Sequence, residues 1–266
     1  MVSSPVNVGS ASGRVTAAIR MASERTGVDF SYLYNQARVE SGLNPNAQAR
    51  TSSARGLFQF IDQSWLATVN NHGRSHGLGW AADAIRQNSQ GRYVVDDPNM
   101  RRSILALRDN PDAASAMAAE FAADNRDHLQ GALGHAVEDV DLYLAHFLGP
   151  GGATRFLRAH DRDPSAAAAP LLPQAARANR SIFYARGGQP RSLAEIRARF
   201  AARMDSASPA APPGTPEVPP GTPPAPSQSV EPAIWQPLPS DQLLAAPSPS
   251  LARMAYLMLA QMGAEI

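Results

Sequence analysis

The fold of this chain is decided by the stretch Gln36-Ala-Arg-Val-Glu40-Ser41-Gly42 and by the block that follows it, Ser52-Ser53-Ala54-Arg55-Gly56-Leu57-Phe58-Gln59-Phe60. The first block ends a segment in which apolar residues recur at helical spacing. Glu40 shares a helix face with the residues three, four and seven positions before it, which are Ala37, Gln36 and Leu33. The pattern therefore predicts a carboxylate on a mostly apolar helix face.

Two interpretations of Glu40 fit this position. Loss of hydration disfavours the charged form of a carboxylate, and a general acid must hold its proton near neutral pH. Glu40 is therefore a candidate catalytic acid. The position alone also fits a carboxylate that caps a turn or pairs with Arg50 or Arg55 and takes part in no chemistry.

Helical spacing recurs along most of the chain up to residue 205. It predicts further helices at 14–23, 100–108, 112–127, 136–148, 153–160 and 193–204. Asp29 is the expected N-cap of the Glu40 helix, residues 72–79 are expected to form a loop, and residues 93–95 a short strand or turn. With 44% hydrophobic and 6% aromatic residues, alanine rather than large rings fills much of the interior. These features predict an all-α domain over residues 10–205.

The order of the motifs resembles the lytic transglycosylases of the SLT, or goose-lysozyme-like, family. That family's signature is Glu-Ser, then a Ser/Ala/Gly loop, then Gly-Leu-Met-Gln and an apolar residue. Here Glu40-Ser41 is followed by Ser52-Ser53-Ala54 and by Gly56-Leu57-Phe58-Gln59, with Phe in place of Met. The resemblance covers roughly residues 15–160. It implies a lysozyme-like fold, a peptidoglycan substrate, and no metal or cofactor.

The resemblance also implies the reaction. Glycosidases commonly use two carboxylates about 5–5.5 Å or about 6.5–9.5 Å apart, but a single acid suffices when the sugar supplies its own nucleophile. Glu40 would protonate the oxygen leaving N-acetylmuramic acid, and the C6 hydroxyl of that sugar would attack C1 to give a 1,6-anhydro product. Asp62, which follows the Gln59 block, fits better as the N-cap of the next helix.

Supporting residues are expected around Glu40. Ser41, Ser53 and Gln59 are uncharged hydrogen-bonding groups that could hold the sugar, although Ser53 could equally cap a turn. Of Phe58 and Phe60, one is expected in the core and the other along the sugar cleft.

A third block, Leu142-Tyr-Leu-Ala-His-Phe-Leu-Gly-Pro-Gly-Gly-Ala153, looks like the segment that closes the cleft in this family. The common family form there is Ala-Tyr-Asn-Ala-Gly, and this version is more similar to flagellum-associated and phage-borne members. Tyr143 and His146 are the candidates to replace the usual Tyr or Asn, although each could also be structural. Glu120 shares a face with Met117, Ala116 and Ala113, so it either lines the cleft as a second acid or partners a core Arg or His.

The composition changes near Ser206. Residues 206–250 are dominated by Pro, Ala, Ser and Gly and are expected to form an extended linker. Residues 251–266 are expected to form a short apolar helix. That helix either packs on its own domain or binds a protein partner, such as a flagellar rod or secretion component.

The remaining composition excludes several functions. The chain has no cysteine, which rules out disulfides and thiolate catalysis, and its net charge of +1 is too small to indicate nucleic acid. It contains neither a membrane-spanning apolar run nor a recognisable signal peptide. The resemblance nevertheless places its action in the periplasm or cell envelope.

Two rival functions remain open. A hydrolytic lysozyme would cut the same bond with water and would need Glu120 or Asp62 as a base opposite Glu40. A catalytically silent wall-binding assembly protein would keep the fold as a scaffold, but it would need neither the Glu40-Ser41 block nor the Gly56–Gln59 block.

Overall fold

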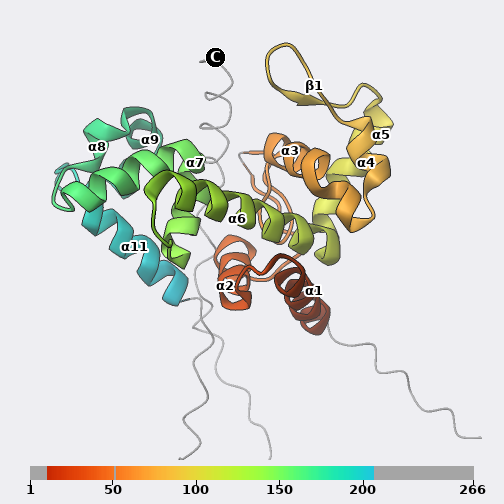
Figure 1. Ribbon diagram of the computed structural model, residues 1–266, viewed down its shortest axis with the longest axis horizontal. Coiled ribbons are helices and arrows are strands. Elements are labelled where there is room, and N and C mark those ends of the chain that lie inside the picture. The colour runs from red at the N-terminus through yellow and green to blue at the C-terminus, as the bar shows by residue number, and fades with distance from the viewer. Residues whose placement is uncertain (1–10, 51, 207–266) are drawn as a thin grey trace, which may run out of the picture. The chain divides into compact units, whose positions relative to one another are not determined.

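The computed structural model describes residues 11–50 and 52–206, and helices dominate that part of the chain (Figure 1). The described residues contain one sheet, in which β1 (Arg86–Gln87) pairs antiparallel with β2 (Tyr93–Val94). The predicted all-α fold is thus confirmed, and the short strand expected at 93–95 is present. The predicted linker, apart from Ser206, and the predicted helix at 251–266 lie outside the described residues.

The first two helices begin and end where local chemistry predicts. They are α1 (Ala11–Thr26) and α2 (Phe30–Ser41). The Asp29 carboxylate accepts hydrogen bonds from the backbone N–H groups of Ser31 and Tyr32, at 2.7 and 3.2 Å, so it caps α2 as expected. Gly42 ends α2 in a left-handed conformation with φ 63°. The position of Glu40, at the last turn of α2, is therefore fixed from both ends.

A long central helix organises the domain. This helix, α6 (Pro111–Leu133), contacts α1, α2, α3 (Asp62–His72) and α7 (Asp139–Arg162). Figure 1 shows α6 crossing the middle of the view, with α1 and α2 on one side of it. Its buried positions are mostly small, namely Ala114, Ser115, Ala118, Ala119 and Ala122. Small side chains let helices approach closely, which explains why an alanine-rich sequence forms this core.

Helix α7 contains a break that the sequence signalled. Gly149 has φ 71° and ψ 160°, outside the helical range, and Pro150 follows it. The predicted stop at this point is real, but the chain resumes as a helix at once, so α7 is two helical pieces joined at a kink. The first piece carries Tyr143 and His146.

Residues 72–79 were expected to form a loop, and that prediction was wrong. This region contains the last residue of α3, the 3₁₀ turn η1 (Gly73–His76) and the start of α4 (Gly79–Ala84). The helical turns here are held by tertiary contacts, because His72 and His76 both bind Glu120 of α6. Local composition could not reveal this, since the partner lies more than 40 residues away.

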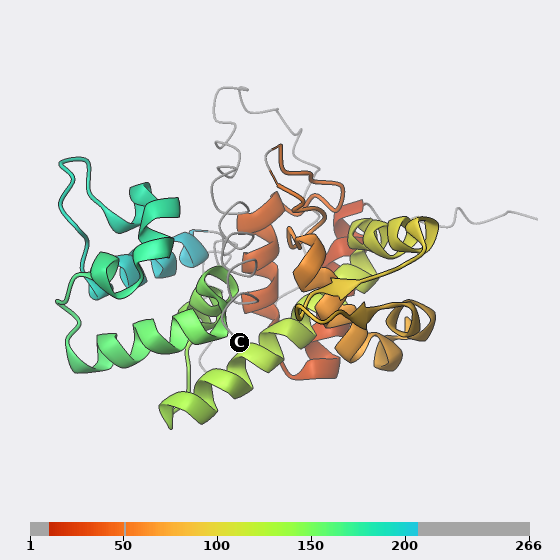
Figure 2. The ribbon, with the colours of Figure 1, turned by 90° about the horizontal axis from the view of Figure 1, so that it is seen from above.

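The remaining elements of the described chain are short helices, a 3₁₀ turn and the longer helix α11. They are α5 (Pro98–Ala106), the 3₁₀ turn η2 (Leu107–Asp109), α8 (Ala168–Leu171), α9 (Pro173–Ala178), α10 (Arg180–Phe183) and α11 (Leu193–Asp205). Ser192 and Glu195 form a capping box at the start of α11. Helix α11 contacts both α2 and α7 (Figure 2), so it supports the two helices that carry the candidate site residues. None of the described helices has the length and apolarity needed to span a bilayer.

Candidate active site

Glu40 lies on the apolar face that its spacing predicted. Its side chain is 7% exposed, and Leu33, Gln36 and Ala37 on the same face are all buried. Two groups from α7 reach the same carboxylate oxygen, Oε1. The Tyr143 hydroxyl donates to it at 3.1 Å, and His146 Nε2 lies 3.3 Å from it. Among the described residues, no group is hydrogen-bonded to the other oxygen, Oε2.

Tyr143 and His146 form a stacked pair beside Glu40. They are three residues apart on α7, and their rings lie 5.9 Å apart with planes 10° from parallel. Burial raises the pKa of Tyr143 well above its ordinary value, and the negative charge of Glu40 adds to the effect. The phenol therefore stays protonated and remains a hydrogen-bond donor. The structure brings both sequence candidates to the same atom of Glu40.

An aromatic row continues from His146 to the loop that follows α2. Phe121 of α6 meets His146 edge-on at 6.3 Å, Phe60 meets Phe121 at 6.1 Å, and Trp65 meets Phe60 at 5.3 Å. Phe60 is 5% exposed and Phe58 is 1% exposed, so both rings are buried. One ring was expected in the core, and Phe58 lies there. That the other ring lines the sugar cleft stays a prediction. Phe60 contributes to the row that supports His146.

Ser41 and Gln59 are hydrogen-bonded to the loop backbone. The Ser41 hydroxyl donates to the carbonyls of Ala37 and Leu57, at 3.0 and 2.8 Å. The Gln59 amide donates to the carbonyls of Ala47 and Gly56, at 3.1 and 2.9 Å. Gln59 also has a positive φ of 48°, which non-glycine residues seldom adopt. These bonds tie the loop at 52–61 to the end of the Glu40 helix.

The loop at 52–61 is also held by Arg108 and Asp109 of η2. The sequence analysis did not predict these contacts. The buried Arg108 donates to the carbonyls of Ser53 and Phe60, at 2.8 and 2.9 Å. Burial lowers its pKa, while the Asp62 carboxylate 3.0 Å away opposes that effect. Arg55 of the loop binds Asp109 through two nitrogens, and this bond raises the pKa of Arg55.

Asp62 does not cap α3 as expected. The N-cap of α3 is Ile61, and Asp62 is the first helical residue. Its carboxylate is instead bound by Arg101 at 2.6 Å and by Arg108 at 3.0 Å. The charge of two arginines outweighs the backbone N–H groups of the helix end as partners for this carboxylate. Ser53 satisfies the helix end from outside, since its hydroxyl accepts from the Asp62 N–H at 3.3 Å.

Glu120 pairs with two histidines, as expected if it partners a core Arg or His. One carboxylate oxygen lies 2.6 Å from His76 Nε2, and the other lies 3.3 Å from His72 Nδ1. His72 also binds Asp124 at 2.8 Å. This cluster joins α3 and η1 to α6. Within the described residues, this cluster shares no partner with Glu40.

Two further buried groups near Glu40 were not selected from the sequence. Tyr32 of α2 is 1% exposed, and its pKa is raised by burial and by the charges of Asp139 and Glu40. Gln36, one turn before Glu40, has a buried Oε1 that accepts no hydrogen bond within the described residues. Both residues share a helix face with Glu40 because they precede it by eight and four positions. The same spacing is typical of ordinary core residues, so it did not single them out.

The comparison with known families matches this half of the site. Residues 17–78 match the family model described as the transglycosylase SLT domain. That segment contains the predicted site residues Glu40, Ser41, Ser53, Gln59 and Phe60. The α7 pair that contacts Glu40, and the η2 residues that anchor the loop, lie outside the matched segment.

Proposed function

We propose that this chain, a member of the transglycosylase SLT family by its matched domain, cleaves the β-1,4 bond between N-acetylmuramic acid and N-acetylglucosamine with formation of a 1,6-anhydro sugar. One observation carries the proposal. Glu40 is a nearly buried carboxylate with one oxygen contacted by Tyr143 and His146, and within the described residues its other oxygen accepts no hydrogen bond. This arrangement suits a group that gives and then takes a proton.

The reaction proceeds in two proton transfers. Protonated Glu40 gives its proton to the glycosidic oxygen as the bond to C1 breaks. The resulting glutamate then accepts the proton of the C6 hydroxyl while that oxygen bonds to C1. Glu40 is protonated again at the end, and no water is consumed. The Tyr143 hydroxyl stabilises the carboxylate between the two transfers, because hydrogen bonds to a charged form favour it.

The partners of the other acids support this route over hydrolysis. A lysozyme would need a second carboxylate facing Glu40 as base or nucleophile. Asp62 and Glu120 were the two candidates for that role. Asp62 is held by two arginines and Glu120 by two histidines. Both carboxylates are thus already paired, so an internal sugar hydroxyl is the nucleophile we propose.

Product analysis tests this reaction. Purified peptidoglycan digested with the full chain is expected to release fragments with anhydro-muramyl ends, which mass spectrometry separates from reducing ends by the mass of one water. Fragments with reducing ends would instead establish a hydrolase. An absence of cleavage at every pH and protein concentration tried would support the wall-binding scaffold.

His146 is expected to act as a positioning residue for Glu40. His146→Ala should lower kcat about tenfold with little change in KM, because it removes the imidazole nitrogen that lies 3.3 Å from Glu40 Oε1. His146→Gln, which can return an N–H donor to the same position, should restore much of that loss. His135→Ala is the matched control, since this exposed histidine contacts the main-chain oxygen of Ala136 and the carboxylate of Asp161. Equal kcat for His146→Ala and wild type would contradict this role.

Location and recruitment belong to the same proposal. Since the proposed substrate is part of the cell wall, we propose that the enzyme acts in the periplasm or cell envelope. We further propose the domain organisation of a catalytic part at 10–205, a linker at 206–250, and a helix at 251–266 that binds a partner in an apparatus crossing the wall. A chain without residues 207–266 that bound every partner of the full chain would overturn the recruitment role.

A further inference from the structure

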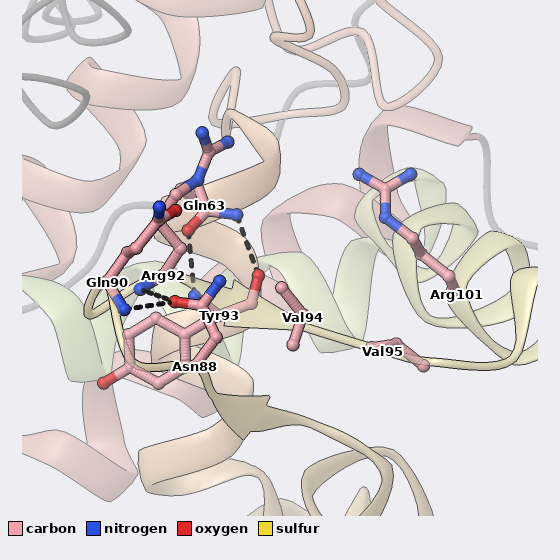
Figure 3. Close-up of a pocket in the computed structure, with 8 residues that line it drawn as sticks. All are labelled: Gln63, Asn88, Gln90, Arg92, Tyr93, Val94, Val95 and Arg101. Carbon is pink, nitrogen blue, oxygen red and sulfur yellow. Dashed lines mark hydrogen bonds between the residues drawn. The ribbon is translucent and has the colours of Figure 1, made fainter.

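A pocket lies beside the short hairpin. Its volume is about 320 Å³, and it is lined by Gln63, Asn88, Gln90, Arg92, Tyr93, Val94, Val95 and Arg101 (Figure 3). Three separate elements, α3, the β1–β2 hairpin and α5, contribute these side chains. None of them belongs to the Glu40 site described above.

The pocket has a fixed frame. Gln63 of α3 accepts from the Tyr93 N–H at 3.0 Å and donates to the Tyr93 carbonyl at 2.9 Å. Its side-chain amide thus pairs with both backbone groups of Tyr93 and fixes the hairpin to α3. Asn88 accepts from the backbone N–H groups of Gln90 and Arg92, at 3.0 and 2.9 Å. The bonds shown in Figure 3 therefore shape the hairpin turn before any ligand arrives.

The lining is positive and carries no acidic side chain. Arg101 shares the Asp62 carboxylate with the buried Arg108. Asp96 is bound by Arg86, which does not line the pocket, and Asp97 accepts from the Asn99 N–H as the N-cap of α5. The exposed guanidinium of Arg92 has no side-chain or carbonyl partner among the described residues. Within the described part of the chain, Arg92 therefore has no acidic partner, and Arg101 shares the Asp62 carboxylate with Arg108.

The two charges are separated. Figure 3 shows the guanidinium groups of Arg92 and Arg101 on the same side of the hairpin as Gln63, one toward each end, with Val94 between them along the strand. An extended chain with carboxylates at intervals and small aliphatic groups between them suits this arrangement, because arginine binds carboxylates with two parallel hydrogen bonds.

We propose that this pocket binds the acidic stem peptide of peptidoglycan, with Arg92 holding one of its carboxylates. The inference rests on the proposed function for its substrate and extends it from the glycan to the peptide. The pocket is joined to the Glu40 site through the chain itself, since Gln63 lies two residues after the loop at 52–61. Arg92 and the valines would thereby select strands that still carry their peptides.

Binding of a soluble peptide tests the pocket without relying on cleavage. The probe is L-alanyl-γ-D-glutamate, titrated into the full chain while the backbone amide signals of residues 86–95 are followed by NMR. Arg92→Ala should weaken binding at least about tenfold. Arg86→Ala, a matched hairpin variant whose guanidinium is occupied by Asp96, should bind as wild type does. The same peptide with both carboxyl groups amidated should not bind.

Three results would overturn the proposal. They are equal binding by Arg92→Ala and wild type, equal binding of the amidated peptide, and displacement of the peptide by an equal concentration of inorganic phosphate. Cleavage provides a second comparison. On intact peptidoglycan Arg92→Ala should raise KM about tenfold with kcat unchanged, and on glycan stripped of peptides it should match wild type. Wild type that cleaves neither substrate would refute the proposed function, while the NMR titration would still report on the pocket.

Discussion

Glu40→Gln is expected to reduce peptidoglycan cleavage by about 10²–10⁴-fold, the usual contribution of a general acid. Glutamine keeps the shape and the hydrogen-bonding reach of the side chain, so Tyr143 and His146 retain a neighbour. It cannot give a proton to the glycosidic oxygen or take one from the C6 hydroxyl. Both transfers of the proposed reaction therefore fail while the fold is preserved. The rate of release of soluble fragments measures the loss.

The control for this variant is Glu24→Gln. Glu24 lies on α1 and is exposed. The same change there removes one surface charge and should leave turnover unaltered. Thermal unfolding of both variants should match wild type within about 2–4 °C, the shift that about 1 kcal/mol produces in a domain of this size. Residual turnover of Glu40→Gln above about a tenth of wild type would exclude Glu40 as the acid.

Gly56→Ala should be the most destabilising small substitution in the described chain. A Cβ at this position would lie 2.0 Å from the Arg108 backbone oxygen, and the residue has φ 83°. Overpacking against backbone and a left-handed non-glycine residue together cost about 2–5 kcal/mol. We expect the midpoint of thermal unfolding to fall by about 10 °C. Cleavage should fall too, because the loop must leave η2 to relieve the contact.

A matched glycine separates the two causes. Gly77 has a similar φ of 72°, but nothing lies within 4 Å of the Cβ that alanine would add. Gly77→Ala should therefore incur the conformational cost alone, about 1–2 kcal/mol. If calorimetry gave the two variants the same midpoint, the close approach of Gly56 to Arg108 would not be a source of stability.

Local patterns in the sequence were enough to predict helix α2 and the place of Glu40 on its apolar face. The Asp29 cap, the Gly42 end and the apolar stripe before Glu40 all act within a few residues, where helix chemistry is transferable. Tyr143 and His146 were found for a related reason. They are three apart on one helix, so they had to face the same way.

The parts that the sequence did not reveal depend on distant contacts. Arg108 holds the carbonyl of Ser53 across 55 residues, and Arg55 binds Asp109 across 54. Nothing near Arg108 distinguishes it from an arginine on a solvated helix face. The helical turns at 72–79 have the same origin, since Glu120 supplies their partner from α6. The packing of Phe60 against Phe121 is a further example, because the motif around Phe60 does not contain α6.

The contact between Phe200 and Tyr143 means that a working fragment of this protein would have to include α11. Phe200 of α11 meets the Tyr143 ring edge-on at 5.6 Å and the Phe147 ring at 4.6 Å. A fragment trimmed to the matched residues 17–78 would keep Glu40 but lose both of its α7 neighbours, the η2 anchor and the ring behind Tyr143. Grafting the motif onto another scaffold would fail for the same reason. The transferable unit is the whole run from α1 to α11, so recombination between related chains would have to exchange it in one piece.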